Sequence, residues 1–161
     1  TDIRCLNYEC VLPVFFEGLC DGQHPYPYYA EWGLYDLLLC GKGKIVQTIP
    51  YIIQPIRKAL RTKNKEVIVR TLEALQLFVL VDPMAGPSLV PYFKSILPLV
   101  NAYKNVYPKS GDELTYSGRK ISGIAEEVNE TLELLEKKGG PDAFINIKYC
   151  IPTYESINRF D

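Results

Sequence analysis

The chain has 161 residues, a length that suits one domain with its own apolar core. Hydrophobic residues make up 47% of it and charged residues 23%, and its formal net charge is -1. This balance argues against a disordered protein and against a general nucleic-acid binder, so we expect a single folded domain over residues 1–161.

Charge is distributed unevenly along the chain. Residues 1–41 carry six acids against one base, residues 42–70 carry eight bases against one acid, and residues 110–161 carry ten acids against six bases. A basic zone therefore lies between two acidic ones. Such a zone could bind nucleic acid, but the net charge of the whole chain makes this the weakest of the functions considered for it.

Cysteine usage and hydropathy indicate the compartment. An odd number of cysteines without a C-x-x-C pair predicts reduced, buried thiols of an intracellular protein. The chain has no apolar run of the roughly 18 residues needed to span a membrane and no secretory pattern, so we expect a soluble protein without a membrane partner. The first residue is Thr1, so an upstream segment could be missing from view. The cysteines are Cys5, Cys10, Cys20, Cys40 and Cys150.

The first half of the chain predicts four helices. Apolar spacing of three and four residues predicts a helix over 8–20, and an aromatic connector over 25–29 leads to a second helix that ends at Gly41. A third helix is expected over 48–60 with Thr48 as its N-cap, and a fourth starts after the cap Asn64. The apolar face of the fourth helix is very wide, which predicts cover on more than one side.

The second half is interrupted by turn residues. Gly86-Pro87 is expected to stop the chain and Ser88 to cap a fifth helix, followed by a polar loop over 106–118. An amphipathic helix is predicted over 119–138, with glutamates on a solvated face. Residues 142–154 are ambiguous and are interpreted as an extended or weakly helical part of a capping segment over 141–161. The glutamates are Glu126, Glu127, Glu130, Glu133 and Glu136.

A repeat underlies these elements. An aliphatic residue, a proline and large apolar residues recur at Leu12-Pro13, Ile49-Pro50 and Val90-Pro91, with the prolines 37 and then 41 residues apart. This is the period of a two-helix armadillo or HEAT unit. We therefore predict an all-α, armadillo/HEAT-like solenoid of stacked helix pairs, an architecture that usually offers an elongated surface to partners.

Catalytic and metal-binding readings find little support. The single histidine, His24, precedes a proline in a predicted turn, and zinc would need several closely spaced thiolate or imidazole ligands. The run Gly41-Lys42-Gly43-Lys44 lacks the spacing of a phosphate-binding loop. A nucleophile elbow is absent. The expectation is a protein that is not an enzyme and that needs no metal or cofactor.

Two groups of residues are candidates for partner binding. Bases around the turn between the third and fourth helices could attract an acidic protein surface, although they could equally be solubilising charges. Aromatic residues near the second helix could anchor an interface, although about half of such residues would be expected in a core. The basic candidates are Arg57, Lys58, Arg61, Lys63 and Lys65, and the aromatic ones are Tyr26, Tyr28, Tyr29 and Trp32.

Several segments together resemble the parkin co-regulated gene protein family. The most distinctive runs from Gly139-Gly140-Pro141-Asp142 through Phe144-Ile145-Asn146-Ile147-Lys148-Tyr149 to Pro152-Thr153-Tyr154-Glu155-Ser156. Others are Leu12 to Cys20, Ala59 to Leu75, Leu89 to Pro98 and Ser110-Gly111-Asp112. The resemblance runs from about Tyr8 to Ser156 and does not indicate which paralogue this is.

The resemblance implies an armadillo/HEAT-like structural protein of cilia and flagella. In that family the protein lies at the inner junction of the axonemal doublet microtubule, where it joins the B-tubule to the A-tubule. Its partners there are α/β-tubulin, a small β-rich junction protein and other microtubule inner proteins. The alternative is a soluble adaptor that binds a small meiosis-expressed protein for cargo transport during sperm flagellum assembly.

Overall fold

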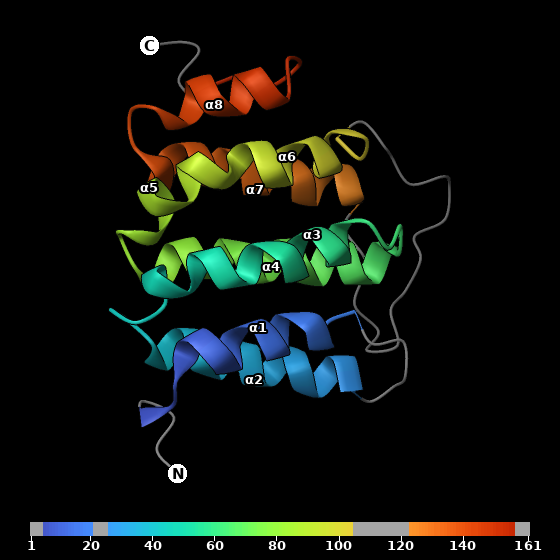
Figure 1. Cartoon of the computed structure of the whole chain (residues 1–161). Coiled ribbons are helices and arrows are strands. Elements are labelled where there is room, and N and C mark those ends of the chain that lie inside the picture. Colours follow the sequence, from blue (N-terminus) through green and yellow to red (C-terminus); the bar gives the residue numbers. More distant parts are fainter. Residues whose placement is uncertain (1–4, 21–25, 105–122, 157–161) are drawn as a thin grey trace.

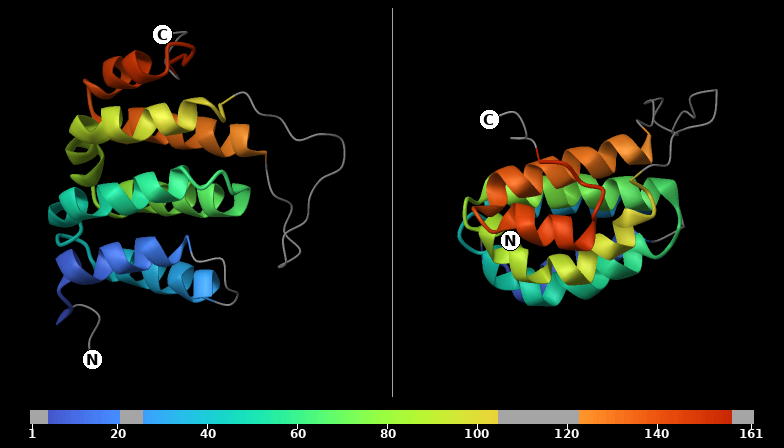
Figure 2. Two further views of the ribbon diagram at one scale, coloured as in Figure 1. Left: turned by 45° about the vertical axis from the view of Figure 1, so that its right-hand side comes forward. Right: turned by 90° about the horizontal axis from the view of Figure 1, so that it is seen from above.

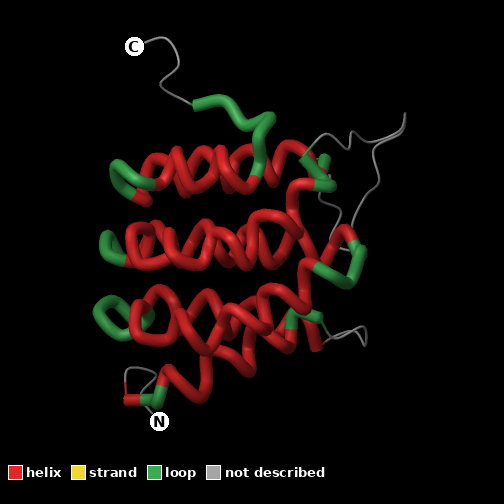
Figure 3. The backbone as a smooth tube through the Cα atoms, turned by 45° about the horizontal axis from the view of Figure 1, so that its top comes forward, coloured by secondary structure: helices red, strands yellow, loops and turns green. Residues whose placement is uncertain are grey.

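The computed structural model describes residues 5–20, 26–104 and 123–156, and the regular elements within these ranges are all helices (Figure 3). This confirms the predicted all-α class. The α-helices are α1 (Tyr8–Gly18), α2 (Tyr26–Cys40), α3 (Ile49–Leu60), α4 (Lys65–Val81), α5 (Ala85–Leu89), α6 (Phe93–Asn101), α7 (Ile124–Gly139) and α8 (Ala143–Cys150). Two short 3-10 helices, η2 (Val46–Thr48) and η3 (Val90–Tyr92), lead into α3 and α6.

The helices lie at successive levels (Figure 1). The first level contains α1 and α2, the next α3 and α4, and the next α6 and α7. Contacts run through the stack in two columns, from α1 to α3 to α6 and from α2 to α4 to α7. Helix α8 packs on both α6 and α7 and closes the far end of the stack (Figure 2).

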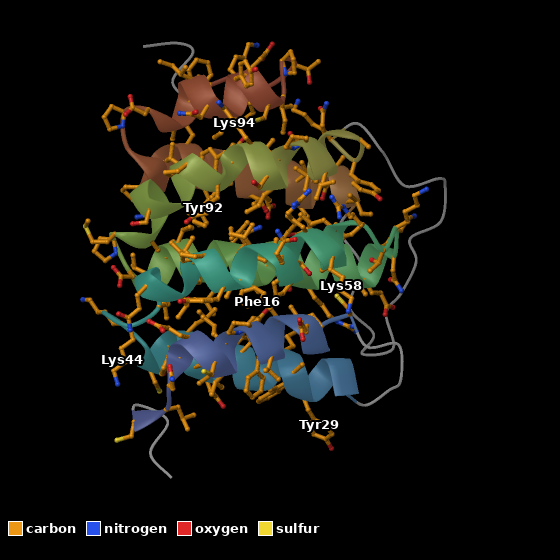
Figure 4. All side chains as sticks on the ribbon, viewed as in Figure 1. Phe16, Tyr29, Lys44, Lys58, Tyr92 and Lys94 are labelled. Carbon is orange, nitrogen blue, oxygen red and sulfur yellow. The ribbon has the colours of Figure 1, made fainter. Side chains whose placement is uncertain are left out.

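One apolar core runs through the levels. Phe16 on α1, Phe78 on α4 and Phe93 on α6 are almost completely buried, and Figure 4 shows Phe16 between the levels of α1 and α3. Helix α3 presents one face of this core through Ile49, Ile52 and Ile56, whose spacing of three and four residues places them on one side of a helix. Burial of such side chains is the main driving force for holding the levels together.

The boundaries of α3 and α4 match the sequence pattern with one exception. Pro50 lies in the first turn of α3, and the side chain of Asn64 caps α4, as predicted. Thr48 occupies the predicted N-cap position of α3, but its side chain does not cap the helix, because its hydroxyl donates a hydrogen bond back to the carbonyl of Ile45. The 3-10 turn before α3 supplies that carbonyl, so Thr48 is the last residue of η2 and its hydroxyl faces away from α3.

Two predicted breaks are helical instead. The expected connector over 25–29 is wrong from residue 26 onward, because α2 begins at Tyr26 with Pro27 in its first turn, where a proline costs no helical hydrogen bond. Gly86 and Pro87 do not stop the chain and Ser88 is not a cap, because all three lie inside the short helix α5. The chain then continues through η3 into α6.

The C-terminal part also differs from expectation. Helix α7 is described from Ile124 and ends before Gly140, whose φ of 88° explains the predicted stop there, whereas the loop over 106–118 and the start of the expected helix lie outside the described residues. The glutamate face is only partly solvated, because Glu127 and Glu136 are buried. Packing of α7 against α4, α5 and α8 covers more of its surface than a single apolar stripe predicts. Residues 143–150 are helical, so of the two interpretations of that segment the helical one is confirmed and the extended one is wrong.

Candidate partner-binding surfaces

A compact turn joins α3 to α4 and carries the basic candidates. Thr62 donates a 2.8 Å hydrogen bond to the carbonyl of Ala59, and the side-chain oxygen of Asn64 accepts hydrogen bonds from the backbone of Glu66 and Val67 at 3.0 and 3.4 Å. Lys63 between them has a φ of 59°, which turns the chain sharply. The turn is therefore held by its own hydrogen bonds, and it presents its charged side chains from a fixed backbone.

The structure brings the five predicted basic residues to one corner of the molecule, which we call the basic corner. It consists of Arg57 and Lys58 in the last turn of α3, Arg61 at its C-cap, Lys63 in the turn and Lys65 at the start of α4. Figure 4 shows Lys58 at this end of α3. All but Arg57 are exposed. Basic residues that only stabilise the C-terminal end of a helix lie in its last turn. Lys63 and Lys65 lie beyond the last turn of α3, so helix stabilisation does not account for them.

Arg57 is partly buried, and Arg70 forms ion pairs within the fold. The Nε atom of Arg57 is buried and makes no hydrogen bond within the described part of the chain. Arg70 lies 3.9 Å from Glu31 on α2 and 3.6 Å from Glu66, one turn back on α4. Arg70 therefore helps to join α2 to α4 and is not part of the basic corner. The accessible charge of the corner comes from the other four residues.

The aromatic candidates lie on α2. Tyr29 is 64% exposed and Trp32 is 59% exposed. These residues are three positions apart, so they share one face of the helix. Tyr26 and Tyr28 begin the same helix, but their side chains lie outside the described residues. The structure therefore places two of the four aromatic candidates on an open surface.

Sequence reasoning missed further exposed apolar residues. Leu39 on α2 and Val14 on α1 are not among the predicted interface residues, yet each is 63% exposed. Leu39 follows Trp32 by seven residues, or about two helical turns. This spacing could have predicted that Leu39 lies on the same face of α2 as Tyr29 and Trp32. At the opposite end of the stack, Tyr149 on α8 is 75% exposed, and the ammonium of Lys94 lies 5.3 Å from its ring centre.

Two of the described thiols have a shifted pKa. Burial raises the pKa of the Cys20 thiol, an effect that nearby Lys58 partly opposes. Burial also raises the pKa of the Cys150 thiol, with Lys94 acting in the opposite sense. A reactive cysteine needs a lowered pKa, so these shifts run the wrong way for a nucleophile. His24 lies outside the described residues.

The cysteines differ from expectation in their burial. None of the five is fully buried, because Cys5, Cys10 and Cys40 are exposed and Cys20 and Cys150 are half-buried, and all five are free thiols. The prediction that they lie in the core is therefore wrong. The core is filled by Leu, Ile and Phe instead, so the small thiols remain at its margin.

The ranges that the structure describes hold neither a candidate metal site nor a candidate membrane span. Within those ranges, no group of His, Cys, Asp or Glu side chains is placed to hold a metal ion. None of the helices in the same ranges combines the length and apolar character that crossing a lipid bilayer requires.

Comparison with known proteins identifies one family. The family model described as Parkin co-regulated protein matches residues 1–156. A mouse protein described as "Parkin coregulated gene protein homolog" is 45% identical to this chain over 155 residues. That alignment covers 96% of this chain and 64% of the mouse protein, so the chain spans less than two thirds of its relative's length.

Proposed function

This chain belongs to the parkin co-regulated protein family, and we propose that it is a structural, non-enzymatic microtubule-associated protein of the axoneme. In this proposal it lies at the inner junction of the doublet microtubule in cilia and flagella. It bridges the B-tubule to the A-tubule by binding α/β-tubulin through one surface and a small β-rich junction protein through another. Other microtubule inner proteins are its neighbours, and its loss would weaken the stability and motility of the organelle.

The arrangement of the helices supports a bridging role. We interpret the successive levels as an armadillo/HEAT-like solenoid in a single domain, in which each helix pair packs only against adjacent pairs. The core continues from the level of α1 to that of α6 through residues such as Phe16 and Phe93. A core that continues between the two ends of the body supports a role as a brace between two partners.

The observation that carries the proposal is the basic corner. Lys58, Arg61, Lys63 and Lys65 are exposed together on one fixed turn. In this proposal tubulin is the acidic partner, so Coulomb attraction would favour this corner as the contact with it. Salt should weaken such a contact, because exposed charges are screened over about 8 Å at physiological ionic strength.

Sedimentation with microtubules tests the proposal. The double variant Arg61→Glu/Lys63→Glu should fold normally, because both side chains are exposed, and should pellet with microtubules much less than the wild type at moderate salt. The matched control is Lys42→Glu/Lys137→Glu, which makes the same change in net charge at exposed positions away from the basic corner. Equal pelleting of all three proteins would remove the basic corner from the proposal.

The alternative is a soluble adaptor that binds a small partner protein for transport during flagellum assembly. The exposure of Tyr29 and Trp32 is the observation that favours it, because such residues anchor protein interfaces. The two roles separate when axonemes are extracted with salt. Retention of the chain on the doublets after high-salt extraction supports the structural role, whereas recovery mainly in the soluble cell fraction supports the adaptor.

A further inference from the structure

The outer surface of the first helix pair is apolar and anionic, and it lies at an end of the stack. Tyr29, Trp32 and Leu39 are each about 60% exposed along one face of α2, and Val14 is similarly exposed on α1. Figure 4 shows Tyr29 pointing away from the other levels. We call these four residues, with Asp36 and Glu17, the end face.

The charge of the end face has one sign. The sequence from residue 5 to residue 41 contains no lysine or arginine. On α2, Asp36 is exposed and lies between Trp32 and Leu39 on the same face of the helix. On α1, Glu17 is exposed one turn after Val14. The charged side chains within α1 and α2 are all carboxylates, so this apolar surface would repel a second copy of itself and would attract a partner with basic flanks.

The geometry suits a helix. On their inner side, α1 and α2 are covered by α3 and α4, the helices of the next level. The outer side of the same pair offers a further helix the same ridges and grooves. From Tyr29 to Leu39 the face is about 15 Å long, enough for about three turns of a partner helix.

We propose that the end face binds an amphipathic helix of another protein, with an apolar stripe flanked by lysine or arginine. The apolar stripe covers Trp32 and Leu39, and the basic flanks lie against Asp36 and Glu17. This site is independent of the basic corner, which has the opposite charge and lies at the turn between α3 and α4. The proposal therefore stands or falls separately from microtubule binding.

The single tryptophan of the chain makes the proposal measurable. Trp32 lies on the end face, so its emission reports only what happens there. The probe is a tryptophan-free synthetic helix of about four turns, with leucine on one face and lysine on both flanks. Its matched control carries glutamate in place of lysine. The lysine peptide should shift Trp32 emission to shorter wavelength and protect it from iodide quenching, and the glutamate peptide should do neither.

Variants of the chain test where the peptide lies. Leu39→Lys changes a side chain that is 63% exposed, so it should fold normally and weaken binding by about tenfold or more. Asp36→Asn should weaken binding by about twofold to fivefold at low salt. Glu130→Gln on α7 makes the same charge change at an exposed position far along the chain and should bind as the wild type does. Circular dichroism of each variant checks that the fold is retained.

Three results would overturn the proposal. One is a Trp32 emission that neither peptide changes or that both change equally. Another is loss of binding in Glu130→Gln as large as in Asp36→Asn, which would indicate attraction to the protein's overall charge. The third is a dimer in sedimentation experiments that Leu39→Lys abolishes, because the end face would then bind a second copy of this chain.

Discussion

The side-chain amide of Gln76 on α4 donates a 2.8 Å hydrogen bond to the hydroxyl of Thr131 on α7, although 55 residues separate the two in sequence. Thr131 in turn donates a 2.7 Å hydrogen bond to the carbonyl of Glu127, one turn back in α7. The amide of Gln76 also lies 3.4 Å from the Glu127 carboxylate. This network lies in the contact between α4 and α7 and fixes how the two helices are aligned.

Thr131→Val should therefore destabilise the protein. The change keeps the shape of a 2% exposed side chain but leaves the partly buried amide of Gln76 without its best acceptor. The expected loss is about 1–2 kcal/mol in the free energy of unfolding, measured with urea. Thr71→Val is the matched control, because Thr71 is fully buried and its hydroxyl donates only to Val67 within the same helix. A cost for Thr71→Val as large as that for Thr131→Val would contradict the role given to the network.

Gly86→Ala should also be costly. A Cβ atom at position 86 of α5 would collide with the backbone carbonyl of Lys138 at the end of α7. Alanine normally stabilises a helix relative to glycine, but here the helices would have to separate, at an expected cost of about 1–3 kcal/mol. Ser88→Ala in the same helix should change stability by less than about 0.5 kcal/mol. Thermal unfolding of both variants measures the difference, and a stabilised Gly86→Ala protein would refute the close packing.

Tyr154 should make stability fall at alkaline pH. Burial raises the pKa of its phenol above the ordinary value of about 10, and the nearby carboxylates of Glu136 and Glu133 raise it further. Above pH 10 the unfolded chain loses this proton while the folded chain keeps it, so ionisation favours the unfolded state and stability decreases with rising pH. Below pH 10 both states keep the proton and the contribution is complete.

The variant Tyr154→Phe should show a weaker alkaline decline than the wild type. Its stability near pH 7 should change little, because the Tyr154 hydroxyl makes no hydrogen bond within the described residues. Tyr51→Phe is the control, because Tyr51 is 54% exposed. Urea unfolding at several pH values between 8 and about 11 measures the slopes. Identical slopes for wild type and Tyr154→Phe would mean that Tyr154 does not contribute.

Lys63→Gly separates stability from binding. Lys63 has a φ of 59°, a conformation that costs a residue with a side chain about 1–2 kcal/mol and glycine nothing. After the entropy that glycine adds to the unfolded chain, the variant should be more stable by up to about 1 kcal/mol. It should nevertheless pellet less with microtubules, because one charge of the basic corner is lost. A variant that is both more stable and fully competent in binding would show that Lys63 makes no contact with tubulin.

The helical class could be predicted from periodicity, but some boundaries could not. Large apolar residues occupy every second position from Ile145 to Ile151, which resembles a strand. Across α8 and its C-cap residue Ile151, the same alternation gives two opposite faces, with Ile147 and Ile151 buried and Ile145 and Tyr149 exposed. Alternation over so few residues fits a helix as well as a strand. Residues i and i+2 share a face of a strand, and residues i and i+4 share a face of a helix. Only packing against α6 and α7 decides between them.

The candidate surfaces were predictable to different degrees. The residues of the basic corner are close in sequence, so the turn that gathers them could be inferred from local signals such as Asn64. Pairing of Arg70 with Glu31 depends on α2 lying beside α4, which no local pattern specifies. Exposure of Leu39 likewise depends on α2 being at an end of the stack. Leucine periodicity alone indicates that a face is apolar, not whether another helix covers it.

The most direct test of the proposed function is imaging of the native doublet microtubule at a resolution that shows side chains. We expect this chain at the inner junction between the A- and B-tubules, with Arg61, Lys63 and Lys65 against acidic residues of tubulin. Density for the chain elsewhere in the cell's microtubules, or at the junction with the basic corner facing solvent, would contradict the proposal.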